Sequence, residues 1–353
     1  MTVGARSWVT RPVAGLVAVV VVAGSVAAGV VAAERLTPDA GVADVARLAP
    51  ADVASIDVTD WSALREHLGA RDDDLVEQAS ARDLATRSTL VSSGEVVADS
   101  LGWSPATVRW EAFVQTTAGS GLLLGLPESD GATRERMRDL GYVQDGDDWT
   151  IELTDLRAGG VSTPETFQHV RLLGDGVAVA SSDVEVLERV GDVADGNVPS
   201  LADDPTAARI WARAADLDAF ALQSGTAGCA STDPAETGPD VAAQAAVAVE
   251  GAGVLQRYRW LLRGLGAADP GAGAEDDFEV ALAYGSGPVA ADQAEVRSRL
   301  ATGPFIGQTG TVEDSIVLTR HGVDGAVAVL EFDRQDGAAS LMSFIGPLVL
   351  ASC

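Results

Sequence analysis

Residues 167–190, with the sequence FQHVRLLGDGVAVASSDVEVLERV, contain the pattern that recurs along most of the chain. Two apolar runs flank Gly-Asp-Gly at 174–176, and this arrangement predicts a β-hairpin. A helix should follow, because Ser182 and Glu185 have the spacing of a capping box and apolar residues then recur at the helical period. Hairpins that alternate with helices predict an α+β fold in which antiparallel or mixed sheets are covered by helices.

Signals of the same kind lie on both sides of this stretch. Asp60 should cap a helix that ends at Gly69, and the run Asp72 to Asp74 should begin the next helix, where the helix dipole favours negative charge. A calcium loop is the alternative for that run, but adjacent carboxylates lack the alternating spacing of such a loop. Asp145-Gly146 predicts a second tight hairpin.

The order strand, helix, hairpin, helix occurs twice. The two helices that end at Gly141 and Gly303 are 162 residues apart, close to half of the 320 residues that follow Ala33. We therefore expect two similar α+β halves, 51–190 and 204–353, joined by a linker at 191–203 and possible products of an internal duplication. The alternative is two ordinary α+β halves whose similarity is coincidental.

An uninterrupted apolar run covers residues 13–33, with Arg6 and Arg11 before it and no acidic residue until Glu34. As a helix it would be ~30 Å long, the thickness of the bilayer hydrocarbon. The positive-inside rule predicts a single-pass membrane protein with a short cytoplasmic tail, 1–12, and a connector, 34–50, that leads to an extracytoplasmic region. The alternative is a signal sequence, cleaved to give a secreted protein.

The charge is strongly acidic, with 24 basic and 52 acidic side chains and a formal net charge of −28. All the acidic residues follow residue 33, so the region expected outside the cell carries −30. Such a surface repels the phosphates of nucleic acids, and we expect no nucleic acid partner. The bilayer would be contacted only through residues 13–33.

Two cysteines, Cys229 and Cys353, lie in the region expected outside the cell. Thiols oxidise there, so an even number predicts one disulfide between them. The alternatives are two free thiols or an intermolecular bridge through Cys353.

Catalytic signals are sparse. Every basic residue is arginine, which removes lysine-dependent chemistries such as Schiff bases and the Walker-A phosphate site. His67, His169 and His321 share no metal-ligand spacing with one another or with cysteine. The acidic cluster most suggestive of acid/base chemistry lies near Trp149 and consists of Asp147, Asp148 and Glu152. The alternative interpretation is a solvated turn before a strand. We therefore assign no catalytic, cofactor-binding or metal-binding residues.

These observations favour a non-catalytic binding or structural role in the bacterial cell envelope, with an envelope protein or a small ligand as partner. The alternative function is an extracytoplasmic hydrolase that uses carboxylates, since this chemistry survives without lysine. A deep pocket with two carboxyl groups of raised pKa would favour the hydrolase, and an apolar groove would favour a binding protein.

Overall fold

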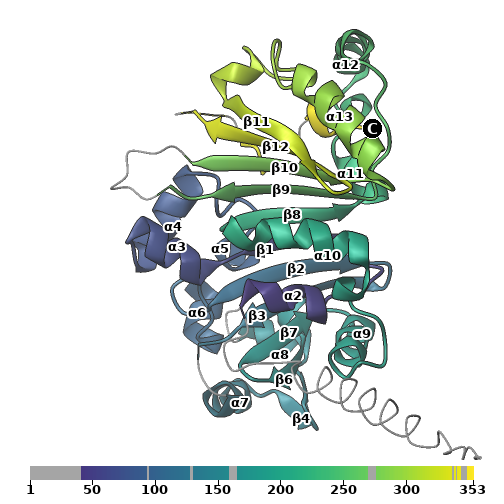
Figure 1. The fold of residues 1–353 in the computed structure, drawn as a ribbon. Helices are drawn as coiled ribbons and strands as arrows, with labels where there is room; N and C mark the ends of the chain where they lie inside the picture. Colours follow the sequence, from purple (N-terminus) through teal and green to yellow (C-terminus); the bar gives the residue numbers. More distant parts are fainter. Residues whose placement is uncertain are drawn as a thin grey trace, which may run out of the picture. The chain divides into compact units, whose positions relative to one another are not determined.

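One antiparallel sheet of twelve strands organises the part of the chain that the computed structural model describes (Figure 1). That part comprises residues 41–353 without 94, 128–129, 159–164, 269–275, 336–337, 339 and 343–347, and it belongs to one compact unit, Pro38–Cys353. The strand order is β11-β12-β10-β9-β8-β1-β2-β3-β7-β6-β5-β4. In chain order the strands are β1 (Ser55–Thr59), β2 (Trp110–Thr116), β3 (Gly119–Gly125), β4 (Val143–Asp145), β5 (Asp148–Thr150), β6 (His169–Gly174), β7 (Val177–Ser181), β8 (Ala219–Ser224), β9 (Trp260–Gly266), β10 (Asp277–Ala283), β11 (Ile316–Asp324) and β12 (Val327–Arg334).

The expectation of two α+β halves with their own sheets is wrong. Strand β1 pairs with β2 on one side and with β8 on the other, so the sheet continues without a break from one half of the sequence into the other. The physical reason is that every backbone N–H and C=O of a buried strand needs a partner, and β1 is buried along its whole length. The predicted membrane segment, 13–33, lies outside the described residues, and no helix among those described is long and apolar enough to cross a bilayer.

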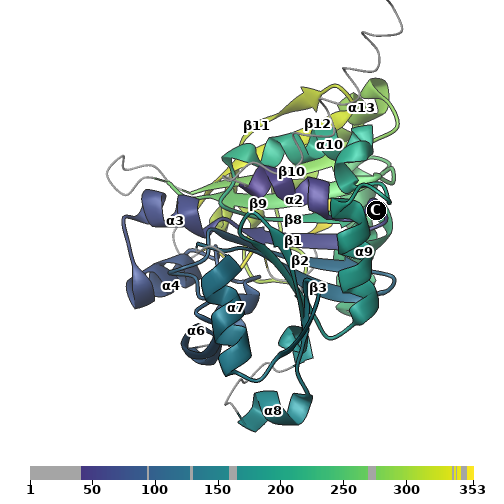
Figure 2. The ribbon, with the colours of Figure 1, turned by 90° about the horizontal axis from the view of Figure 1, so that it is seen from below.

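Helices cover both faces of the sheet (Figures 1 and 2). One face carries α2 (Val42–Leu48), α9 (Val184–Ala194) and α10 (Pro205–Trp211); α2 packs on α9, α9 packs on β3, β6 and β7, and α10 packs on β9 and β10. The helices on the opposite face are α3 (Trp61–Leu68), α4 (Asp72–Ala81), α5 (Thr89–Ser93), α6 (Glu95–Leu101), α7 (Asp130–Asp139), α11 (Gly225–Ser231), α12 (Pro239–Ala252) and α13 (Gly287–Leu300). The short α8 (Leu153–Ala158) precedes β6 in the chain.

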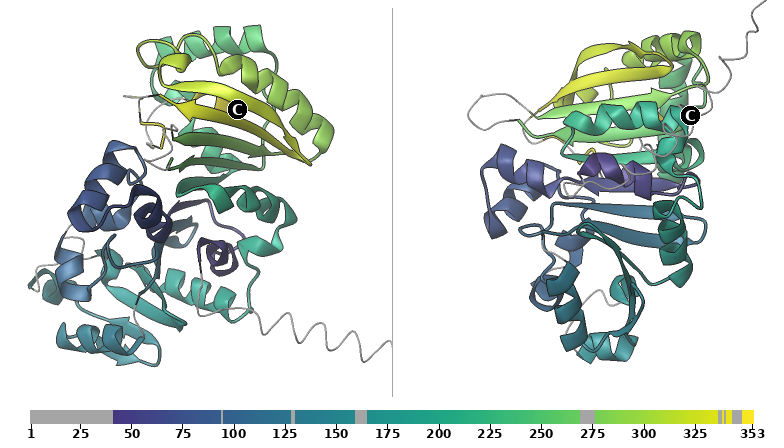
Figure 3. Two further views of the ribbon diagram at one scale, coloured as in Figure 1. Left: turned by 60° about the vertical axis from the view of Figure 1, so that its left-hand side comes forward. Right: turned by 60° about the horizontal axis from the view of Figure 1, so that its bottom comes forward.

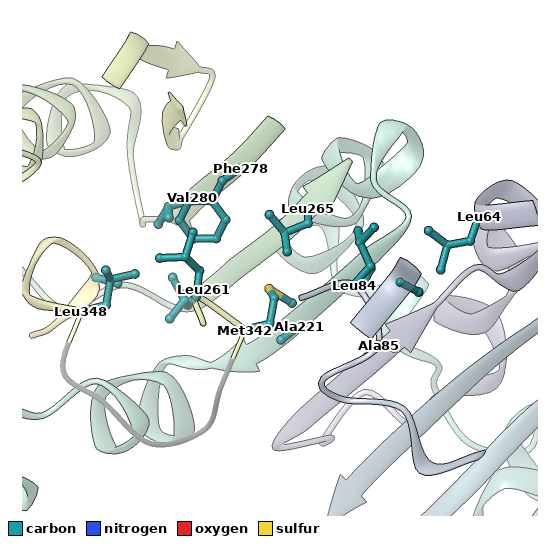
Figure 4. Close-up of a cluster of buried hydrophobic side chains, with 14 of the residues drawn as sticks. Leu64, Leu84, Ala85, Ala221, Leu261, Leu265, Phe278, Val280, Met342 and Leu348 are labelled. Atoms are coloured by element: carbon teal, nitrogen blue, oxygen red, sulfur yellow. The ribbon is translucent and has the colours of Figure 1, made fainter. Parts of the chain in front are cut away.

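The apolar core on the second face extends from the α3–α5 helices across the middle strands to the end of the chain. Figure 4 shows a row of its members from Leu64 through Leu84 and Met342 to Leu348. Both views in Figure 3 show the sheet passing between the two groups of helices. The helical group α3–α6 is therefore packed against the centre of the sheet, not against one of its ends.

Local signals explain several of these elements. Asp60 accepts a hydrogen bond from Ala63 N at 2.9 Å, and Gly69 ends α3 in the left-handed conformation, as the sequence predicts. The predicted turn between β6 and β7 also forms, with Gly174, Asp175 and Gly176 all at positive φ. The capping box predicted at Ser182 is wrong: α9 begins at Val184, after Asp183, without a side-chain cap.

Candidate functional site

A band of polar side chains crosses the centre of the sheet on the face that carries α3–α6. Strand register places Ser55, Asp57 and Thr59 of β1 on this face, beside polar residues of the neighbouring strands β2, β8 and β9. We call this band the polar strip; its other members are Glu111, Gln115, Gln223 and Arg263. Apolar side chains of the core flank it on both sides, so its charges are held away from water.

Asp57 is the central carboxylate of the polar strip and is 3% exposed. Its Oδ1 accepts a hydrogen bond from Nη1 of Arg87, which follows α4 in the chain, while Oδ2 has no hydrogen-bond partner among the described residues. Burial raises the pKa of the Asp57 carboxyl, and the charges of Arg87 and Arg263 oppose this rise. Burial, together with the charge of Arg87, lowers the pKa of Arg263 to about 10. The contact between Asp57 and Arg87 therefore connects strand β1 to the segment that follows helix α4.

Glu111, on β2, makes a second connection between sheet and helices. Its carboxylate accepts hydrogen bonds from Trp61 Nε1 at 2.9 Å, from Thr89 N at 3.0 Å and from Leu90 N at 3.1 Å. Burial raises its pKa, and these hydrogen bonds oppose the rise. One buried side chain thus fixes the first residue of α3 and the first turn of α5 on the sheet.

Helices α4, α5 and α6 border an open cavity of about 470 Å³. We call it the α4–α6 cavity. Its apolar lining comes from one side of α4, from α5 and α6, and from the turn that precedes β2; it consists of Val76, Leu90, Val91, Ala98, Pro105 and Ala106. Two serines, Ser80 and Ser104, add polar groups. The volume and lining are typical of a small-molecule site.

The periodicity of α4 explains how this lining arises. Leu75 and Ala79 face the core and are buried, whereas Val76 and Ser80 lie one position further along and face the cavity. Three carboxylates share the cavity side of the helix; they are Asp72, Asp73 and Glu77, here called the acidic rim. All three are exposed, and none forms an ion pair with a residue that the structure describes.

The acidic rim includes two of the residues that the sequence interpretation assigned to the start of a helix. The structure places α4 at Asp72, as expected, and adds a feature that the sequence did not predict, namely that Asp72 and Asp73 also border a cavity. Among the described residues, no group of three or more His, Cys, Asp or Glu side chains is arranged to hold a metal ion. Helix α4 begins at Asp72, where the sequence predicts a helix start, and the cavity beside it is a further feature.

The three histidines lie far apart along the sheet. His67 Nδ1 is 3.0 Å from Oδ2 of Asp218, whose carboxylate is buried and also accepts from Ala267 N. His169, on β6, lies beside Thr150, and burial lowers its pKa. His321, on β11, is 3.3 Å from Glu295. The His67–Asp218 pair has the geometry of a base with its orienting acid, but no serine, threonine or cysteine within the described ranges is bonded to it.

The acidic cluster near Trp149 is a solvated turn, the alternative that the sequence left open. Asp148 forms two hydrogen bonds with Arg171, and Asp147 pairs with Arg134. The Trp149 ring is fully buried beneath the Arg138 guanidinium, at 5.4 Å, so it does not present a face to a sugar ring.

The two cysteines are bonded to each other, with their Cα atoms 5.4 Å apart, as the sequence predicts. The bond holds the chain end against α11. Arg297, fully buried on α13, donates to the carbonyl oxygens of Leu350 at 2.7 Å and Ser352 at 2.9 Å. Covalent and polar contacts together fix the last residues of the chain.

Comparisons with protein-family models, with curated proteins and with solved structures found no match. The geometry of the chain is therefore the basis on which a function is assigned.

Proposed function

We propose that this chain is a non-catalytic binding protein of the bacterial cell envelope and that it takes the apolar part of a small ligand into the α4–α6 cavity. The observation that carries the proposal is the cavity itself, about 470 Å³ in volume and lined by six apolar side chains. Binding there would remove apolar surface from water on both partners, which is favourable by about 25 cal/mol for each Å².

The surroundings of the cavity support a role in binding. The backbone N–H of Leu90, a residue of the cavity lining, donates a hydrogen bond to the carboxylate of Glu111. The same carboxylate holds Trp61, so the wall is fixed to a buried part of the sheet. A site whose walls are already in place loses little conformational entropy when a ligand enters.

Ligand titration tests the proposal directly. We expect 1-decanol, a neutral chain of suitable apolar character, to bind with measurable heat in isothermal titration calorimetry and to raise the unfolding midpoint. Ala98→Phe places a ring into the cavity from α6 and should weaken this binding at least tenfold. Val247→Phe makes a comparable enlargement at a side chain that is 72% exposed on α12 and should leave binding unchanged. Failure of 1-decanol and of charged ten-carbon analogues to bind would contradict the proposal.

The location in the envelope is tested separately. We propose that residues 13–33 anchor the protein in the membrane, with the signal-sequence alternative still open. Mass spectrometry of the protein recovered from cells distinguishes an intact N-terminus from cleavage after Ala28 or Ala33. Protease treatment of intact spheroplasts should degrade the region after Glu34, and protection of that region would refute an extracytoplasmic location.

A further inference from the structure

The acidic rim lies along one side of α4, next to the apolar lining of the cavity. Asp73 and Glu77 are separated by one helical turn, so their carboxylates project from the same side, with Val76 between them in the sequence and also in the cavity wall. A ligand that fills the cavity would therefore have one end close to these carboxylates.

The charge of the rim is not balanced from within the described part of the chain. Asp72, Asp73 and Glu77 take part in no ion pair there, although most of the buried carboxylates of the sheet are paired with arginine or hydrogen-bonded. Neither Arg65, on α3, nor Arg71, which precedes Asp72 in the chain, is part of the cavity lining, and Arg65 donates to the carbonyl oxygens of Pro105 and Val108. An unbalanced negative rim beside an apolar wall attracts a partner that is positive at one end and apolar at the other.

We propose that the ligand of the α4–α6 cavity is an amphipathic organic cation, a molecule with a protonated or quaternary nitrogen on an apolar body. This rests on the proposed function, because it assigns the chemical class of the ligand of that same site. The ammonium group lies at the acidic rim and the apolar body contacts Val76, Leu90 and Val91. A metal ion would leave that apolar wall uncovered, and a carboxylate-bearing ligand would place like charges side by side.

Three ligands with the same ten-carbon chain isolate the contribution of the charge: decylamine, 1-decanol and decanoate, all used below the concentration at which they form micelles. Exposed carboxylates contribute modestly to binding, so we expect decylamine to bind about tenfold more tightly than 1-decanol, and decanoate more weakly than either. Raising the salt concentration should weaken decylamine binding and leave 1-decanol binding unchanged, because salt screens exposed charges.

A matched pair of double variants locates the effect. Asp73→Asn with Glu77→Gln should reduce the affinity for decylamine about tenfold, to that for 1-decanol, and leave the affinity for 1-decanol unchanged. Glu135→Gln with Asp139→Asn removes the same charge at the same spacing from exposed positions on α7 and should change neither affinity.

The outcomes separate this inference from the proposed function. Equal affinities for decylamine and 1-decanol, or equal effects of the two double variants, would overturn the cation assignment and leave the cavity as a binding site for neutral apolar ligands. Binding of none of the three ligands would refute the proposed function itself.

Discussion

Glu111→Ala tests whether the polar strip holds the helices that form the cavity. The substitution removes an acceptor that serves three donors, namely Trp61 Nε1, Thr89 N and Leu90 N, and leaves these donors without it in a buried site. Each buried donor that is left without an acceptor lowers the free energy of unfolding by about 1–3 kcal/mol. Relief from burying a carboxylate, whose cost is visible in the raised pKa of Glu111, offsets part of this loss. We expect a net decrease in the free energy of unfolding of about 4 kcal/mol.

Urea denaturation, followed by far-UV circular dichroism at pH 7 without reductant, measures this decrease. Glu111→Gln retains one acceptor oxygen but places an NH2 group where a donor already lies, so its effect should be smaller, about 2 kcal/mol. Trp61→Phe removes only the indole donor, and a double-mutant cycle with Glu111→Ala should show a coupling of about 1 kcal/mol. Neutral surface substitutions change the free energy of unfolding by no more than ~0.5 kcal/mol. A change as small as that in the Glu111→Ala variant would refute the anchoring role.

Three further predictions concern stability. Because burial raises the pKa of Asp57 and Glu111, the folded protein holds protons that the unfolded chain has already released, so the contribution of these two groups to the free energy of unfolding should fall as the pH rises above about 4, the ordinary pKa of a carboxyl group, at constant ionic strength; a contribution that rises there would contradict the raised pKa values. Cys353→Ser should reduce the free energy of unfolding by about 2–4 kcal/mol, since the disulfide joins residues 124 apart, and dithiothreitol should lower the parent protein to the same value without affecting the variant. Arg297→Lys keeps the charge but loses the planar donors that reach the chain end, and thermal unfolding should show a loss of about 2–3 kcal/mol; an unchanged midpoint would show that those hydrogen bonds are dispensable.

Elements with a local signal could be predicted from the sequence. Helix α3 has both a capping aspartate and a terminal glycine, and the β6–β7 hairpin has a turn whose residues tolerate positive φ. The helix that was expected to end at Gly303 is α13, whose last residue is Leu300. In each case the information lies within a few residues of the element, so no distant contact is needed to recognise it.

Strand β1 was not assigned from the sequence, and without it the two halves were expected to have separate sheets. Its five residues alternate polar and apolar side chains, a pattern typical of a strand with one face in water. Both faces are in fact buried, because the polar side chains meet partners such as Arg87, 30 residues away in the sequence. Helix α11 has no apolar periodicity to predict it, since its glycine, alanine and serine side chains bury little surface.

The cavity could not be predicted because its walls come from four separate segments and none of them carries a binding motif. Of its polar residues, only Asp72 and Asp73 belonged to a feature that the sequence identified, the start of a helix. Helix-dipole physics accounts for acidic residues at that position whether or not a cavity is present. The distinguishing fact, that the neighbouring positions Val76 and Glu77 face a void, depends on how α4 packs against α5 and α6.

The polar strip and the α4–α6 cavity can be explained together. Apolar packing is not directional, so helices held to a sheet by apolar contacts alone would shift to fill a void of this size. Here Arg87 is bonded to Asp57 and Leu90 to Glu111, and these directional contacts fix the helical layer where it leaves space. Burying the two carboxylates is unfavourable, as their raised pKa values indicate, and hydrophobic residues of similar volume would often be at least as stable. The proposed binding role accounts for this arrangement, because buried charges that hold the helices apart keep an apolar cavity open where tighter packing would close it.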